Sequence, residues 1–206
     1  MFRRILILFA VAAFTLPSCK RSCDIVPGEL RCEYLESPAI DIQKPRLSWI
    51  DEVRNEELKN VSQSAYRIVV ASTKRKAGKG DGDIWDSGKV GSSESHLVEY
   101  GGPEMASGKD YYWTVTVWDG EGRESRRSQV ARWTTGIMDP SEWKAAWIGS
   151  PWESELPGKE FTPAPVFRKT FELDRLPVSA KAFVSGLGYF DFSVNEVKAG
   201  DPDERL

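Results

Sequence analysis

The chain has 206 residues, with 28 Lys and Arg against 31 Asp and Glu, a formal net charge of −3, and 40% hydrophobic residues. This length and hydrophobic fraction suffice for one large or two small packed domains. The nearly balanced charge argues against a nucleic-acid partner, because proteins that bind nucleic acids carry a basic surface. The single histidine, His96, excludes a site with several histidine ligands and allows at most one Ser-His-Asp arrangement.

The beginning of the chain has the pattern of an export signal. Arg3-Arg4 precedes an apolar run over residues 5–16, which is too short to span a bilayer but fits the apolar core of a signal peptide. Leu16-Pro17-Ser18-Cys19 resembles a bacterial lipobox, in which the cysteine carries lipid and becomes the first mature residue. We therefore expect a lipoprotein signal peptide over residues 1–18, lipidation of Cys19, and an exported protein anchored to a membrane, in the periplasm or at the cell surface.

Two further cysteines, Cys23 and Cys32, remain after the lipidation site. In an oxidising compartment this even pair allows a disulfide, and two unpaired thiols are the alternative. A zinc site is not expected, because no histidine or further cysteine is nearby.

The next part of the chain predicts a β-sandwich. Short alternating runs separated by Gly, Pro, Asp and Ser indicate seven strands, at residues 30–35, 46–50, 65–72, 83–85, 96–100, 111–119 and 131–135. In the sixth run one face carries Tyr111, Trp113, Val115 and Val117, so we expect these aromatics to pack in a core. Seven such strands fit a fibronectin type III or immunoglobulin-like sandwich over residues 24–137.

A second unit is expected over residues 141–206, with strands at 165–173, 180–185 and 189–194. About four strands would leave an apolar face and unpaired edges, because a jelly roll needs about eight. Either a partner covers that face or the chain has been cut from a longer one.

Several segments, in this order and spacing, carry a family resemblance. They include Pro45-Arg46-Leu47-Ser48-Trp49, the run from Gln63 to Ser72, Trp85-Asp86-Ser87-Gly88, the run from Tyr111 to Asp119, and Ser185-Gly186-Leu187-Gly188-Tyr189. Together they resemble the N-terminal region of bacterial α-L-rhamnosidases of glycoside hydrolase family 78, as found in lipoprotein enzymes of Bacteroides-type bacteria. The resemblance covers about residues 29–200.

The resemblance implies a modular enzyme: a fibronectin-like domain, a jelly-roll domain akin to carbohydrate-binding modules, an α/α toroid with the active site, and a final β-domain. The family removes terminal α-L-rhamnose from plant glycans with inversion, by two carboxyl groups of the toroid. No residue here corresponds to them, so we expect no catalytic residue, cofactor or metal site in this chain. Asn195-Glu196 stands where the family usually has Asn-Gly, which predicts a poorer hairpin turn.

Sugar contact is the remaining candidate chemistry, at Trp152 in a loop and at Tyr189 after a Gly-Leu-Gly bend; packing of Tyr189 between domains is the alternative. Asp81, Asp83 and Asp86 lack the frame of a calcium loop and predict a solvated turn. The expected partners are rhamnose-containing glycans, through the parent enzyme, and a membrane. The alternative to an accessory part of a rhamnosidase is a lipid-anchored glycan-binding or structural module without hydrolase activity.

Overall fold

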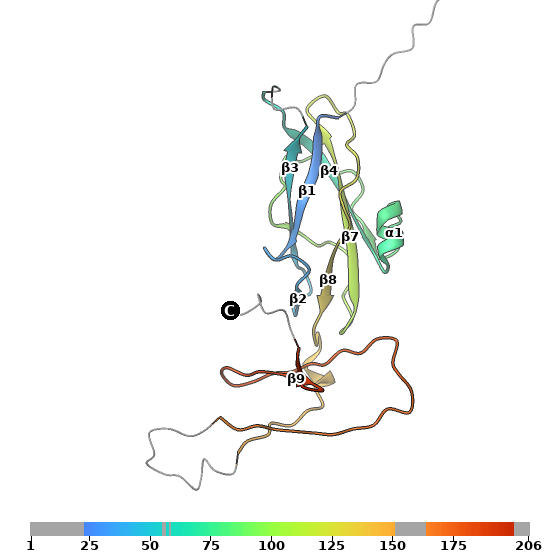
Figure 1. The fold of residues 1–206 in the computed structure, drawn as a ribbon. Coiled ribbons are helices and arrows are strands. Elements are labelled where there is room, and N and C mark those ends of the chain that lie inside the picture. Colours follow the sequence, from blue (N-terminus) through green and yellow to red (C-terminus); the bar gives the residue numbers. More distant parts are fainter. Residues whose placement is uncertain (1–22, 55–56, 58, 151–163, 200–206) are drawn as a thin grey trace, which may run out of the picture.

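The computed structural model describes residues 23–54, 57, 59–150 and 164–199. Its main body is a sandwich of two β-sheets (Figure 1). One sheet has the order β1-β3-β6, made of β1 (Ile25–Cys32), β3 (Arg46–Val53) and β6 (Val98–Glu99). The other has the order β2-β8-β7-β4-β5, made of β2 (Ala39–Ile40), β8 (Ala131–Thr135), β7 (Asp110–Asp119), β4 (Gln63–Ala71) and β5 (Trp85–Asp86).

The predicted all-β, immunoglobulin-like fold class is confirmed, and each of the seven predicted strands has a counterpart in the sandwich. The first prediction, at residues 30–35, misplaced its strand. β1 ends at Cys32, and Glu33 and Tyr34 form a two-residue turn with φ of 50° and 67°. Cys32 and Leu35 exchange backbone hydrogen bonds of 3.0 Å across this turn. The strand was misplaced because the alternating pattern of apolar residues continues through Glu33 and Tyr34, where the backbone turns.

The core of the sandwich is aromatic. The expected inward face of β7 is confirmed, because Tyr111, Trp113, Val115 and Val117 are all buried. Trp133 of β8 is fully buried among them, and its ring stacks on that of Tyr111 with centroids 5.5 Å apart and an interplanar angle of 9°. Burial of such rings supplies much of the free energy that holds two sheets together.

The opposite face of β7 is also covered, by a short helix that sequence analysis did not predict. α1 (Lys74–Lys79) begins after the N-cap Thr73 and ends at Gly80, whose φ is 76°. The Thr114 hydroxyl donates to the carbonyl of the fully buried Ala77 at 3.4 Å. Thr followed by Gly at this spacing is a start and stop signal for a single-turn helix, so the signal was present in the sequence.

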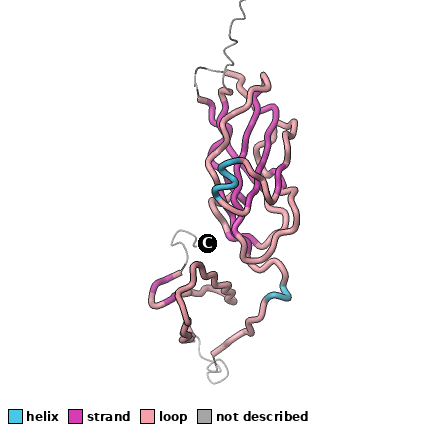
Figure 2. The backbone as a smooth tube through the Cα atoms, turned by 90° about the vertical axis from the view of Figure 1, so that its right-hand side faces the viewer, coloured by secondary structure: helices cyan, strands magenta, loops and turns pink. Residues whose placement is uncertain are grey.

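Beyond the sandwich, the described chain is mostly extended without sheet partners (Figure 2). It holds a 3₁₀ turn, η1 (Pro140–Glu142), and one hairpin of β9 (Ser193–Val194) and β10 (Val197–Lys198). The strands predicted at residues 165–173 and 180–185 are wrong, and the one predicted at 189–194 shrinks to its last two residues. Alternation alone does not make a strand, because a strand also needs a neighbour for its backbone hydrogen bonds.

The turn of this hairpin forms despite its unfavourable sequence. Asn195 has φ of 50° and Glu196 has φ of 69°, and strand partners Val194 and Val197 flank them. A glutamate in the left-handed conformation costs of order 1 kcal/mol relative to glycine. Asn195-Glu196 therefore adopts the turn geometry, but at a lower stability than Asn-Gly would give.

We expect Trp133→Ala to lower the free energy of unfolding by about 3–5 kcal/mol, because it empties a fully buried site between the sheets. The matched control is Trp147→Ala, since Trp147 is 68% exposed; its effect should stay within about 0.5 kcal/mol. Urea unfolding followed by circular dichroism measures both. Equal effects of the two substitutions would contradict the placement of the core.

Candidate functional site

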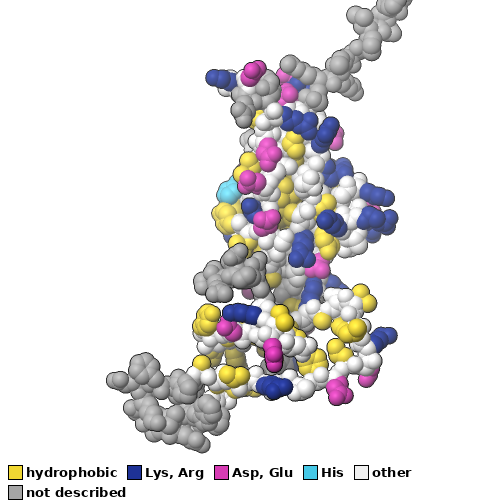
Figure 3. Space-filling view, viewed as in Figure 1, with side chains coloured by type: hydrophobic (Ala, Val, Ile, Leu, Met, Phe, Trp, Pro, Cys, Tyr) yellow, Lys and Arg dark blue, Asp and Glu magenta, His cyan; other side chains and the backbone are white. Residues whose placement is uncertain are grey.

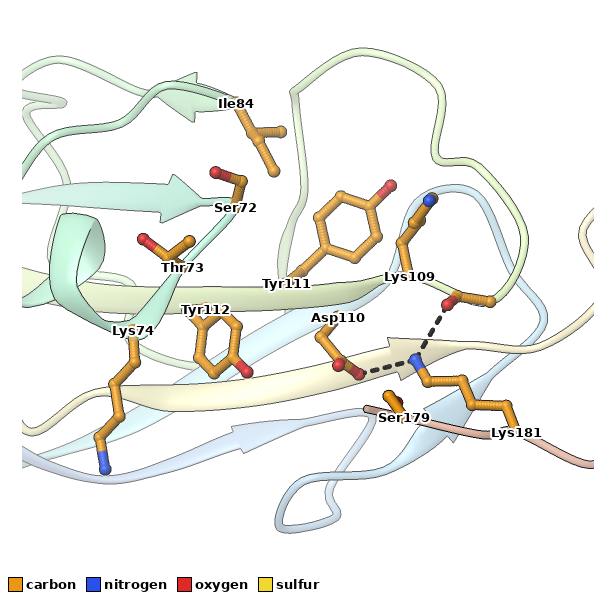
Figure 4. A pocket seen from close by; sticks show the side chains of 11 residues that line it. Ser72, Thr73, Lys74, Ile84, Lys109, Asp110, Tyr111, Tyr112, Ser179 and Lys181 are labelled. Atoms are coloured by element: carbon orange, nitrogen blue, oxygen red, sulfur yellow. Dashed lines mark hydrogen bonds and ion pairs between the residues drawn. The ribbon is translucent and has the colours of Figure 1, made fainter. Parts of the chain in front are cut away.

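A pocket of about 520 Å³ lies at one end of the sandwich (Figure 4). This volume falls within the range of small-ligand sites, roughly 300–1,000 Å³. Its walls come from the end of β4, the start of α1, the start of β7 and a stretch of the C-terminal segment; the lining residues are Ser72, Thr73, Lys74, Ile84, Gly108, Lys109, Asp110, Tyr111, Tyr112, Ser179 and Lys181.

The register between β4 and β7 builds most of this pocket. Ala71, the last residue of β4, pairs with Tyr112 near the beginning of β7. Ser72 and Thr73, which follow β4 directly, therefore come beside Asp110 and Tyr112. Residues 40 positions apart in the chain meet because the two strands pair antiparallel.

Lys181 ties the C-terminal segment to this end of the sandwich. Its ammonium donates to the Gly108 carbonyl at 2.9 Å and to Asp110 Oδ1 at 3.0 Å (Figure 4). The Thr134 hydroxyl donates to the same carboxylate oxygen at 2.6 Å. That hydrogen bond and then the Lys181 charge hold the pKa of Asp110 below its usual value.

A second contact lies beside the Lys181 tie. The Phe183 ring approaches Gly108 so closely that a Cβ built on the glycine would lie 3.2 Å from it, and Gly108 has φ of +67°. A side chain here would meet both backbone strain and the ring. Glycine at this position therefore permits the close approach of the segment to the sandwich.

The pocket is positively charged. Three of its lining residues are lysines, against the single carboxylate of Asp110. Lys74 and Lys109 are exposed, and among the described residues neither ammonium has a hydrogen-bond or ion-pair partner. Lys and Arg side chains also gather on the side of the sandwich that carries α1 (Figure 3).

The acidic groups in and beside this pocket do not suit acid–base catalysis. Burial alone would raise the pKa of Asp83, but hydrogen bonds from Lys76 and Ser72 bring it to about 2. Asp110 is also held ionised. A general acid for glycoside hydrolysis needs a raised pKa, so this arrangement can bind a ligand but does not assemble a hydrolytic pair.

Of the two predicted sugar-contact residues, only Tyr189 lies within the described chain, and it does not line this pocket. Tyr189 is 84% exposed on the C-terminal segment, and its hydroxyl donates to Asp191 at 3.4 Å. Trp152 and Cys19 lie outside the described residues. Sequence analysis did not find the pocket, since its parts come from distant positions; the local signal was the run of lysines around residues 74–79.

Cys23 and Cys32 are both buried and unpaired in the structure, so the disulfide weighed above is not formed. β1 holds them apart: Cys23 precedes the strand and Cys32 is its last residue. Nine residue steps at about 3.3 Å each separate them far beyond the reach of a disulfide, even with the bulge in β1. Burial raises the pKa of both thiols, that of Cys32 to about 12.

Two of the three aspartates weighed as calcium ligands, Asp83 and Asp86, are engaged in ion pairs. Asp83 pairs with Lys76 at 2.8 Å, and Asp86 pairs with Arg67. Within the described ranges, no cluster of three His, Cys, Asp or Glu side chains could hold a metal ion. Among the same residues no helix is long and apolar enough to cross a membrane.

The C-terminal segment exposes a long series of apolar side chains, while those of the sandwich are mostly buried (Figure 3). Exposed members of this series are Val166, Phe167, Phe171, Leu173, Leu176, Val178, Leu187, Tyr189 and Val197. An uncovered apolar series of this length is typical of a surface that meets another part of a protein.

Residues 27–139 match the sequence profile of the Rha78A-like, N-terminal immunoglobulin domain. The match covers just over half of the chain. This chain belongs to that family. It is 35% identical over 180 residues to an α-L-rhamnosidase of Formosa agariphila, which covers 79% of this chain and 19% of the relative. It is 42% identical over 120 residues to an α-L-rhamnosidase of Streptomyces avermitilis, covering 58% of this chain and 11% of the relative.

Solved structures agree with the sequence relatives. The fold is similar to that of Streptomyces avermitilis α-L-rhamnosidase complexed with L-rhamnose, with a TM-score of 0.57 and 38% identity over 63% of this chain and 12% of that one. It is also similar to α-L-rhamnosidase from Dictyoglumus thermophilum, with a TM-score of 0.56 and 38% identity over 60% and 14%. The chain therefore spans about a fifth or less of the length of the relatives it matches.

We expect Cys23 and Cys32 to resist alkylation at about pH 8 in the folded protein, because buried thiols with raised pKa values supply almost no thiolate. Peptide mapping by mass spectrometry after iodoacetamide treatment measures this. Both should react once the chain is unfolded in urea without reductant. Labelling that requires a reductant as well would show a disulfide and contradict the structure.

Lys181→Ala should release the C-terminal segment from the sandwich, because it removes both hydrogen bonds of the tie. Proteolytic cleavage within residues 164–199 should become faster, by up to about fivefold for a partly exposed ion pair. Lys198→Ala is the matched control, since Lys198 pairs with Asp191 inside the same segment. An equal acceleration by both variants would show that the tie does not hold the segment.

Proposed function

We propose that this chain is the N-terminal accessory portion of an exported α-L-rhamnosidase that removes terminal α-L-rhamnose from plant glycans. The sandwich is its folded base, and the C-terminal segment leads toward the catalytic part of the enzyme. The family membership supports this proposal, as do relatives that are about five to nine times longer than the region they share with this chain.

The observation that carries the proposal is the contrast between the two parts of the chain. The sandwich buries most of its apolar side chains within itself, while the segment from 164 to 199 leaves Val166, Leu176 and Val178 more than 90% exposed. Exposed side chains of this kind gain free energy when another surface covers them. The remaining domains of a rhamnosidase would supply that surface, and Lys181 would fix where the segment leaves the sandwich.

Hydrolysis itself is assigned to the rest of the enzyme and not to this chain. Asp110 in the pocket and Asp83 beside it are ion-paired and have lowered pKa values, so neither is prepared to protonate a leaving sugar. Export and lipid anchoring through Cys19 belong to the same proposal and rest on the apolar run and lipobox-like motif of the sequence.

A replacement experiment tests the accessory role. The region of the Streptomyces avermitilis enzyme that matches this chain is deleted, and the full chain is fused in its place. We expect deletion to lower the melting temperature and the hydrolysis of an aryl α-L-rhamnoside, and the fusion to recover most of both. This chain alone should show no turnover.

The matched control is the same fusion carrying Trp133→Ala, which should fail to restore the enzyme because the sandwich is disrupted. Turnover by the isolated chain would contradict its non-catalytic role. A fusion no better than the deletion would contradict the accessory role.

A further inference from the structure

We propose that the pocket beside Lys181 binds a saccharide bearing an anionic group, a carboxylate or a sulfate. This ligand would extend the accessory role. We infer its anionic group from the lysines of the pocket, and the saccharide class rests on the proposed function. It adds a glycan-contact site to the sandwich itself, apart from Trp152 and Tyr189.

The first support is the charge of the pocket. Lys74, at the start of α1, and Lys109, in the loop before β7, line the pocket on opposite sides, and their side chains point in different directions (Figure 4). Neither ammonium has a partner among the described residues, while the only lining carboxylate, Asp110, is already bound by Lys181 and Thr134. An anionic group at either side of the pocket would therefore find one free cation, and Asp110 is already neutralised, which favours charge-assisted hydrogen bonds to the ligand.

The second support is the set of neutral groups. Tyr112 is half-buried in the wall of the pocket, and its hydroxyl has no hydrogen-bond partner among the described residues. Ser72 and Thr73 also line the pocket; the Ser72 hydroxyl donates to Asp83, and the Thr73 hydroxyl accepts from the Lys76 amide. A half-buried aromatic ring together with several hydroxyls suits a ligand that has both C–H faces and hydroxyl groups, such as a sugar ring.

The third support is the place of the pocket in the fold. Ser179 and Lys181 belong to the C-terminal segment, and the other lining residues belong to the sandwich. A ligand seated here touches both parts, so its binding would also stabilise the joint between them. The basic side chains gathered around α1 extend the positive surface from this end of the sandwich (Figure 3).

Calorimetry with the full chain tests the proposal, using four probes: trigalacturonate, a sulfated maltotriose, unmodified maltotriose and inorganic sulfate. We expect one or both charged trisaccharides to bind at least about tenfold more tightly than maltotriose and than sulfate alone. Which of the two binds more tightly identifies the anionic group. Added salt should weaken the binding.

The double variant Lys74→Gln with Lys109→Gln should lower the affinity for the charged trisaccharide about tenfold, and Tyr112→Phe should lower it without changing the salt dependence. The matched control is Lys59→Gln, an exposed lysine before β4 and at the opposite end of the sandwich, which should change nothing. Circular dichroism verifies that each variant is folded.

Equal affinity for charged and neutral trisaccharides, equal affinity for sulfate alone, or no loss in the double variant would each overturn the proposal. No binding by either charged trisaccharide would overturn it as well. These measurements use no hydrolysis, so their failure leaves the accessory role intact, and failure of the enzyme fusion leaves the pocket result intact.

Discussion

The pairing of β4 with β7 is the constraint on which the rest of the structure depends. Its register turns Trp113, Val115 and Val117 toward the core and brings the residues after β4 beside the beginning of β7. A shift by one residue would send the aromatic face of β7 outward and separate Ser72 from Tyr112. The hydrophobic core and the candidate site are therefore fixed by the same ladder of hydrogen bonds.

The two parts of the chain differ in what covers their apolar side chains. In the sandwich, apolar side chains find partners in the opposite sheet, and α1 covers the face of β7 that would otherwise meet water. In the C-terminal segment, similar side chains alternate along the sequence but find no sheet to complete. Lys181 and Phe183 hold the segment at one end of the sandwich and leave most of its apolar residues available to a partner.

This difference explains how far the sequence could be interpreted. The strands of the sandwich were predictable because their alternating apolar residues are in fact buried against the opposite sheet, as Tyr111 and Trp113 are. Apolar residues also alternate at 165–173, but in the described chain no second sheet buries them, so the strand prediction failed there. The end of β1 was missed because Glu33 and Tyr34 are unusual residues for a tight turn with positive φ.

The candidate site was beyond sequence reasoning for a related reason. Lys74 comes to the same end of the sandwich as Lys109 and Tyr112 only through the β4–β7 register, and Lys181 joins this end from a distant part of the chain. The helix α1 was within reach, since Thr73 and Gly80 mark its ends. The unpaired state of Cys23 and Cys32 followed from the placement of β1 between them, which a count of cysteines does not reveal.

The central claim is that the sandwich folds stably without further domains and that the apolar side chains of residues 164–199 become buried only against another domain. Hydrogen exchange of the chain alone, and then with the separately produced remainder of a related rhamnosidase, tests this most directly. Amides of β4 and β7 should exchange slowly in both samples, while those of 164–199 should exchange quickly alone and slow down with the partner. Slow exchange of 164–199 in the chain alone, or no change with the partner, would contradict the claim.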